Sequence, residues 1–303
     1  MADAPGYARV SIPEGQWLGG NCLVSVRLGV DAGPERQQSA YGERLYEFEI
    51  HAAQLADHDL LRSLRGSHVC VRASAGLAEL THDTAALMSQ AECVFVLPPE
   101  GQVARAANIL ASLGFRVHLD ASAPVVDCSA LMAATDYYLF NPVLRTPVQP
   151  FHALLEHIAQ GRGYTLWDTE SESPATDFYL SEDGHVSLAR RWHSAARLYG
   201  CVGDSWDALV DSPPRRRLLL FRRHLFLEQS PCVFCADLDV CGGYLRALDP
   251  IADCSPWRQV FSRLRDEAEQ ARDLLAREPG SSTAPCPPMD PRRPGTSRDG
   301  GEA

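Results

Sequence analysis

The sequence contains no lysine, so all 28 of its positive charges are arginines. This absence excludes a Walker-type phosphate loop and a lysine Schiff base, because both need the lysine amine. The 39 acidic residues leave a formal net charge of -11, which argues against affinity for nucleic acid or anionic membranes. No apolar run reaches the length of a membrane span, and residues 1–14 lack the pattern of a secretory signal. We therefore expect a cytoplasmic protein that binds neither nucleic acid nor membrane.

The ten cysteines of the chain are free thiols or metal ligands rather than disulfides if the location is reducing. Cys70, Cys93 and Cys128 sit in or beside apolar segments, so we interpret them as core residues. Cys286 is flanked by prolines and is not a candidate ligand. Four others form a C-x2-C-x5-C-x12-C pattern near the C-terminus: Cys232, Cys235, Cys241 and Cys254.

Four thiolates in this spacing suit either a [4Fe-4S] cluster or a tetrahedral zinc ion. The C-x2-C pair directs two sulfurs to one centre, and Gly242-Gly243 after the third cysteine lets the backbone bend sharply. Zinc sites more often use two C-x2-C pairs, whereas this pattern has one. The spacing therefore favours an iron–sulfur cluster and leaves zinc as the alternative.

Short β-branched runs alternate with helical patterns between residues 45 and 160, which predicts parallel βα units. We count about four or five units, too few for a closed eight-unit barrel. Strands are also predicted at 137–140 and 164–167, a helix at 151–160, and a hairpin over 178–188. The expected fold class is α/β: a partial or degenerate (β/α) barrel, followed by a small α+β metal domain.

The composition divides the chain into three parts. Residues 1–165 form the predicted barrel domain, and residues 166–277 form the predicted metal domain, which ends in a charged amphipathic helix from residue 255. Residues 278–303 are rich in Pro, Gly, Ser and Arg without an apolar pattern, so we expect a disordered tail.

The stretch 178–254 resembles the SPASM or twitch extension of radical S-adenosylmethionine enzymes. It has the hairpin with Asp183-Gly184, then a segment from Gly200 that ends in Ser212-Pro213, and then C-x2-C-x5-C-x-G with a later lone cysteine. The resemblance implies an auxiliary [4Fe-4S] cluster on the four cysteines. It also implies that the βα region is a degenerate radical-enzyme barrel.

The chain departs from that family in its catalytic motif. The family's catalytic cluster needs C-x3-C-x2-C after the first barrel strand, but here no cysteine lies between Cys22 and Cys70. Ligands of the first auxiliary cluster are also missing, because residues 187–189 contain no cysteine and Tyr244 stands three residues after Cys241. The resemblance therefore implies a pseudo-radical-enzyme protein with one cluster. Such a protein would be a partner of a catalytic maturase, or a peptide-binding subunit, in the modification of a ribosomally made peptide.

Two other functions remain open. One is an enzyme that uses the cluster or a second metal without cleaving S-adenosylmethionine, and histidines converging with carboxylates at the strand ends would favour it. The other is a zinc-stapled interaction module, in which the metal serves only folding. The sequence assigns no catalytic residue and no binding residue for an organic cofactor.

Further polar residues are weaker candidates. His193 is the best placed histidine to replace a missing ligand, and near it lie His185, Trp192 and Tyr199. Residues 215–217 and 222–224 form a basic face, which we interpret as a solvated helix surface or an acidic-peptide contact. Four carboxylates are interpreted as a loop rather than as acid–base pairs: Asp168, Glu170, Glu172 and Asp177.

Overall fold

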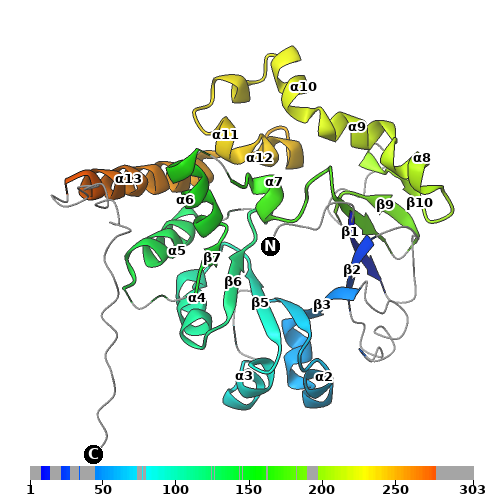
Figure 1. The fold of residues 1–303 in the computed structure, drawn as a ribbon, viewed down its shortest axis with the longest axis vertical. Coiled ribbons are helices and arrows are strands. Elements are labelled where there is room, and N and C mark those ends of the chain that lie inside the picture. Colours follow the sequence, from blue (N-terminus) through cyan, green and yellow to red (C-terminus); the bar gives the residue numbers. More distant parts are fainter. Residues whose placement is uncertain are drawn as a thin grey trace, which may run out of the picture.

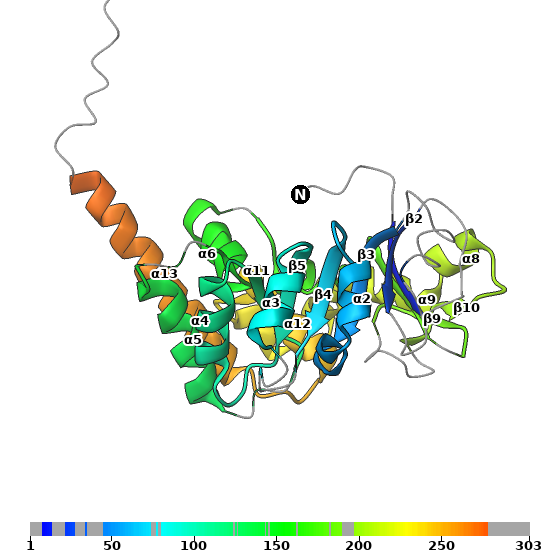
Figure 2. The same ribbon diagram turned by 90° about the horizontal axis from the view of Figure 1, so that it is seen from below.

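The computed structural model contains one β-sheet with helices on both sides of it (Figure 1, Figure 2). It describes residues 8–13, 22–27, 34, 45–73, 77 and 80–277, with gaps at 124, 126, 143, 145, 162, 182 and 190–196. The tail predicted to be disordered, 278–303, lies outside the described residues. So do Cys286, Trp192 and His193.

The strands of the described chain are β1 (Ala8–Pro13), β2 (Cys22–Arg27), β3 (Leu45–His51), β4 (His68–Arg72), β5 (Glu92–Leu97), β6 (Arg116–Leu119), β7 (Val148–Gln149), β8 (Asp177–Leu180), β9 (His185–Ser187) and β10 (Gly200–Cys201). They form one sheet in the order β10-β9-β8-β1-β2-β3-β4-β5-β6-β7. The pairs from β8 through β1 to β7 are parallel, and the β8–β9 and β9–β10 pairs are antiparallel. The predicted hairpin, β8 with β9, therefore extends the sheet beside the first strand.

The helices of the described chain are η2 (Ala52–Ala56), α2 (His58–Ser63), α3 (His82–Met88), α4 (Val103–Ser112), α5 (Cys128–Phe140), α6 (Phe151–Gln160), α7 (Leu166–Thr169), α8 (Trp206–Val210), α9 (Pro213–Leu219), α10 (Phe221–Leu227), η5 (Pro231–Phe234), α11 (Leu238–Cys241), α12 (Tyr244–Leu248) and α13 (Ser255–Arg277). Side chains of Asp57, Thr81 and Asp127 accept backbone N–H bonds and cap α2, α3 and α5. Helices α2 and α3 lie on one side of the sheet, and α9 to α12 lie on the other (Figure 1, Figure 2).

Alternate residues of the central strands face opposite sides of the sheet. One set is apolar and belongs to the main core: Phe48, Ile50, Val69, Val71 and Phe95. Burial of each such side chain stabilises the fold by about 1.5–3 kcal/mol. Cys93 belongs to the same core, and Cys70 is also buried, as predicted, while Cys128 is half-buried.

Two strands predicted from the sequence are wrong. Residues 137–140 continue helix α5, because the Asp127 cap starts a helix that the N–H of Asn141 closes on Tyr137. Residues 166–169 form α7, since Thr165 and Asp168 make a reciprocal capping box. In both places helix capping outweighs the β propensity of the aromatic residues.

The predicted α/β class with parallel strands is confirmed, and helix 151–160 has the bounds of α6. The sheet does not close into a barrel within the described chain, since no pairing joins β7 to β10. The boundary predicted at residue 165 stays a prediction. The same sheet contains strands from both sides of that boundary.

Candidate metal site and polar cavity

The C-terminal lobe, helices α8 to α13, carries the four predicted metal ligands on neighbouring short elements. Cys232 lies in η5 and Cys235 caps its end, while Cys241 is the last residue of α11 and Cys254 directly precedes α13. The N–H of Cys235 donates to the carbonyl of Cys232 at 3.0 Å, which forms the tight turn expected of the C-x2-C pair. Gly242 ends α11 with a φ of 64°, where the chain turns away.

The lobe thiols influence one another. Burial raises the pKa of Cys241 to about 12, while backbone N–H groups of Leu245 and Gly243 lower it by donating to the sulfur. The Cys254 and Cys232 thiols raise this pKa further. Burial is also the largest cause that raises the pKa of Cys254, and the thiols of the C-x2-C pair add to it. The thiols of Cys232 and Cys254 therefore act electrostatically on Cys241, and those of Cys232 and Cys235 act on Cys254.

The donor set fits an iron–sulfur cluster or zinc by its chemistry. Among the residues that the structure describes, no group of three or more His, Cys, Asp or Glu side chains has the arrangement that holds a metal ion. The four sulfurs nevertheless belong to one small lobe, and two backbone N–H groups point at the Cys241 sulfur. Hydrogen bonds of this kind stabilise a thiolate ligand and tune a cluster. The ligand assignment therefore remains a proposal.

The Gly-Gly pair after Cys241 is a packing contact as well as a turn. Trp167 of α7 donates its indole N–H to the carbonyl of Gly242 at 3.1 Å. A Cβ at Gly242 would lie 2.8 Å from Trp167 Cδ1, and one at Gly243 would lie 2.7 Å from Leu225 Cδ1. Only glycine lets α7 and α10 approach the cysteine segment this closely.

A cavity of about 920 Å³ lies against the sheet face opposite the main core. Its walls include the strand residues that alternate with the core residues: Glu47, Glu49, His51, Cys70, Arg72, Arg116 and His118. Residues 169–172 after α7 and 177–179 of β8 complete the wall. Carboxylates outnumber cationic groups in this lining, so the cavity is acidic.

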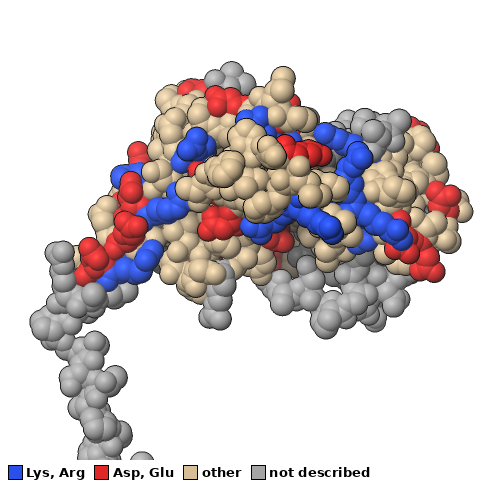
Figure 3. Space-filling view, turned by 90° about the horizontal axis from the view of Figure 1, so that it is seen from above, with Lys and Arg blue, Asp and Glu red and all other residues tan. Residues whose placement is uncertain are grey.

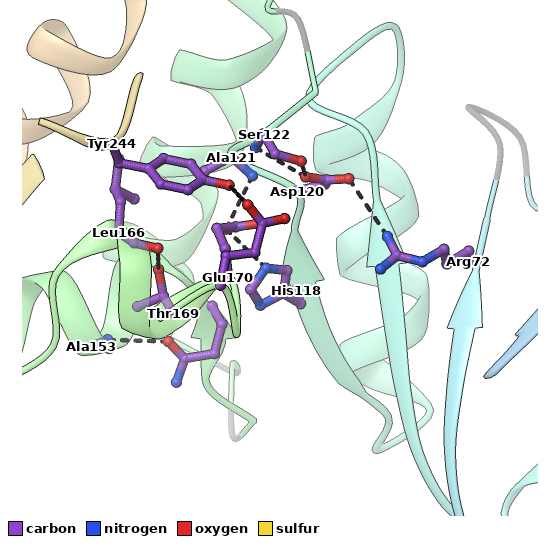
Figure 4. Close-up of polar contacts among 12 residues, drawn as sticks. Arg72, His118, Asp120, Ala121, Ser122, Ala153, Leu166, Thr169, Glu170 and Tyr244 are labelled. Carbon is purple, nitrogen blue, oxygen red and sulfur yellow. Dashed lines mark hydrogen bonds and ion pairs between the residues drawn. The ribbon is translucent and has the colours of Figure 1, made fainter. Parts of the chain in front are cut away.

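Arg72, at the end of β4, joins two of these carboxylates. Its guanidinium lies 3.1 Å from Glu49 and 3.6 Å from Asp120, and Figure 4 shows it directed at Asp120. Burial lowers the pKa of Arg72, but the carboxylates outweigh this effect and raise it above its ordinary value. Asp120 also accepts the N–H of Ser122 at 2.9 Å, which holds the carboxylate in place.

His118 of β6 and Glu170, just after α7, form a pair with an Nε2–Oε1 distance of 3.0 Å, and their side chains are 14% and 4% exposed (Figure 4). The same oxygen accepts the N–H of Ala121 at 3.1 Å. Burial raises the pKa of Glu170. Burial would lower the pKa of His118, but the adjacent carboxylate outweighs it and raises that pKa. Both directions favour a proton retained by the pair, as in a general acid–base site.

Tyr244 of α12 connects the C-terminal lobe to the cavity wall. Its hydroxyl donates to Oε2 of Glu172 at 3.0 Å, and both residues are buried. Its ring meets that of Trp167 edge-on, with centroids 5.1 Å apart. The resemblance to SPASM extensions expects a cluster ligand at this position, whereas here the side chain has a packing role.

The interpretation of residues 168–177 as a plain acidic loop is wrong. Glu172 and Asp177 are buried, and Glu170 is held in the pair with His118. Asp168 accepts the N–H of Thr165 and caps α7. Their partners are distant in the sequence or supplied by the backbone, so the composition of the segment alone did not reveal them.

Other predicted candidates lie away from the lobe cysteines. His185 contacts Cys201, with an Nδ1–Sγ distance of 3.3 Å. Tyr199 is buried, and its ring packs edge-on against Phe178. Arg215 is also buried and donates to two backbone carbonyls, so its assignment to a solvated basic face is wrong.

The sequence reasoning missed the His118–Glu170 pair and the Arg72 network. A signal was present in the strands, because Glu47, Glu49 and His51 alternate with apolar residues. Arg116 and His118 flank Val117 in the same way. This alternation indicates a polar second face of the sheet. It does not indicate which side chains pair there.

Comparison with known proteins supports the fold. No protein-family model matches the chain, and no curated protein matches it significantly. Its fold is similar to that of native anSMEcpe with bound AdoMet, with a TM-score of 0.56, 13% identity, and coverage of 91% of this chain and 86% of that one. Native anSMEcpe with bound AdoMet and Cp18Cys peptide gives 0.56, 14%, 82% and 86%. At this level of identity, the likeness shows a shared fold.

Proposed function

We propose that the chain is an iron–sulfur protein that does not cleave S-adenosylmethionine itself. It would act as a partner of a catalytic maturase, or as a peptide-binding subunit, in the modification of a ribosomally made peptide. The observation that carries the proposal is a lobe with four cysteines in a chain that has no cysteine between Cys22 and Cys70. The proposal includes a cytoplasmic location, where thiols stay reduced. Within the described chain, no helix has the length and apolar character to cross a membrane.

The four lobe cysteines would hold one [4Fe-4S] cluster, which transfers single electrons when bound. The remaining residues hold the site in place. The N–H groups of Gly243 and Leu245 donate to the Cys241 sulfur, and Trp167 and Tyr244 tie the lobe to α7 and the cavity wall. If zinc occupies the site instead, the metal would stabilise an interaction module by about 10 kcal/mol.

The solved structures support a peptide as the ligand class. The protein that shares this fold, anSMEcpe, has been solved with AdoMet alone and with AdoMet and a peptide. Its identity to this chain is 13% to 14%, so the fold is what the two share. A peptide ligand for this chain is therefore part of the proposal.

A specific observation favours a second function, an enzyme in its own right. The His118–Glu170 pair lies in a large cavity, near the carboxyl ends of parallel strands, where α/β proteins place their ligands. The pKa values of both groups are raised, which favours a proton held by the pair and available for transfer. This reading requires a substrate that reaches His118.

Anaerobic purification followed by iron, sulfide and zinc analysis tests the first proposal. We expect iron and sulfide in equal amounts, and no 5′-deoxyadenosine after incubation with S-adenosylmethionine and dithionite. Zinc without iron would overturn the cluster, and 5′-deoxyadenosine would overturn the non-cleaving role. Co-purification with the products of neighbouring genes tests the partner, and a complete radical enzyme and a small precursor peptide are expected there.

A further inference from the structure

Helices α9 and α10 present an outer face in which arginines and large apolar side chains are mixed. The exposed arginines are Arg216, Arg217, Arg222 and Arg223. The apolar members are 46% to 67% exposed: Leu219, Leu220, Phe226 and Leu227. We call these eight residues the α9–α10 face.

Helical spacing explains why the two kinds of residue lie together. In α10, Arg222 and Phe226 are four residues apart, as are Arg223 and Leu227, so each pair occupies one side of the helix. Arg216 and Leu220 repeat this spacing at α9. Each of these arginines therefore lies one helical turn before a large apolar side chain on the same side of the helix.

Within the described residues, few acidic side chains neutralise the arginines of this face. Arg216 pairs with Asp211 at 3.2 Å. Arg217, Arg222 and Arg223 make no ion pair with any residue that the structure describes. Figure 3 looks onto this side of the molecule and shows arginine side chains gathered in a band across it. Such a band stands out in a chain whose net charge is -11.

A merely solvated helix surface explains the arginines but not the apolar residues between them. Exposed clusters of large apolar residues mark contact sites, and Phe and Arg are enriched in protein interfaces. A partner that buried Phe226 and Leu227 would bring its own charges against the arginines. Acidic charges are the ones that would gain by this contact.

We propose that the α9–α10 face docks an acidic amphipathic segment of a peptide or protein, with Asp and Glu toward the arginines and large apolar side chains against Phe226 and Leu227. This deepens the proposed function and rests on it, because it assigns the partner-binding surface. The face belongs to the lobe of the four cysteines, since Ser230, between α10 and η5, donates its N–H to Leu225 at 2.9 Å. A docked segment would therefore sit beside the candidate metal site.

The test uses the full chain and three labelled synthetic 20-residue peptides in fluorescence anisotropy. One peptide is an acidic amphipathic helix with Leu and Phe on one side. The second has the same composition in scrambled order, and the third has the acids replaced by lysine. We expect the first to bind more tightly than the other two, and to bind more weakly as salt screens the charges.

Variants locate the binding on the face. Arg222→Glu with Arg223→Glu should weaken binding of the first peptide about tenfold. Phe226→Ser with Leu227→Ser should weaken it by a similar factor, about tenfold. The matched control is Arg105→Glu with Ile109→Ser on α4, where an exposed arginine and apolar residue have the same spacing. The control should bind as the unchanged chain does.

Equal binding by all three peptides, or equal weakening by the control variant, would overturn the docking surface. A chain that dimerises through Phe226, or that binds anionic vesicles through Arg222 and Arg223 but not the peptide, would overturn it in favour of another occupant. Iron and sulfide are measured on the same samples. If the unchanged chain holds the cluster but does not bind the first peptide, only the docking surface is contradicted. If it binds the peptide without any cluster, only the iron–sulfur function is contradicted.

Discussion

The hydroxyl of Tyr244 donates a buried hydrogen bond to Glu172 across 3.0 Å, joining two residues that lie 72 positions apart. Through this bond the cysteine lobe and the cavity wall share one polar contact. Glu172 is 4% exposed, so the bond forms where water contributes little to its solvation.

Tyr244→Phe keeps the ring and removes one donor from the buried carboxylate. We expect it to lower the free energy of unfolding by about 1–3 kcal/mol. Tyr137→Phe is the matched control, because its hydroxyl bonds Asn108 at the surface, and it should cost less than about 0.5 kcal/mol. Urea unfolding of both variants measures the difference, and equal losses would show that the Tyr244 bond has no special weight.

The His118–Glu170 pair predicts a pH dependence of stability. Both folded pKa values are raised, so the folded state holds protons to higher pH than the unfolded chain. The contribution of His118 is complete below its ordinary value of 6.5 and is lost as pH rises through the folded value. Stability should therefore fall with rising pH. Glu170→Gln removes the largest cause that raises the pKa of His118, and burial remains the largest cause that lowers it, so this slope should reverse.

Urea unfolding at several values between about pH 6 and pH 9 measures this slope. The control is Glu92→Gln, which removes the partner of His68 in an exposed pair with an Nδ1–Oε2 distance of 3.1 Å. Because solvent screens this exposed pair, that variant should change the stability by less than Glu170→Gln does. A stability gap between Glu170→Gln and the unchanged chain that widens with rising pH would contradict the raised pKa values.

Gly242→Ala should loosen the contact between α7 and the cysteine segment. The new Cβ would meet Trp167 Cδ1 at 2.8 Å in a backbone with a φ of 64°. Gly66→Ala shares the positive φ, at 75°, but has nothing within 4 Å, so it measures backbone strain alone. We expect Gly242→Ala to cost about 1–3 kcal/mol more than Gly66→Ala in thermal or urea unfolding. Similar costs would mean that Trp167 moves aside freely.

Cys241→Ser should remove most of the bound iron, because it replaces one of the four proposed thiolate ligands. Cys128→Ser alters a half-buried cysteine outside the lobe and should leave the iron content unchanged. Iron and sulfide analysis with absorption spectra after anaerobic reconstitution gives the comparison. Full iron content in Cys241→Ser would remove Cys241 from the ligand set.

Local patterns predicted much of the fold. Helix α6 follows from its apolar spacing and from Gly161, which ends it with a φ of 68°. The β8–β9 hairpin follows from the turn at Gly184. The strand expected at 137–140 failed because the helix cap lies ten residues earlier, at Asp127, beyond the reach of a local β-propensity argument.

The candidate site likewise has one part that the sequence reveals and one part that it does not. The cysteine group is visible in the sequence because its members fall within one short stretch. The pair of His118 and Glu170 is separated by 52 positions, so only the parallel sheet brings its members together. Without the sheet order, neither residue differs from an ordinary surface group.

The pairing of Arg9 in β1 with Asp177 in β8 has a consequence for folding during synthesis of the chain. Strand β1 is synthesised before β8, and β2 can cover one of its edges soon after β1 is made. The other edge stays uncovered until β8 has been synthesised, and an uncovered edge readily joins a strand of another molecule. Nascent chains that stop before β8 are therefore the species most exposed to aggregation, and the most in need of a chaperone.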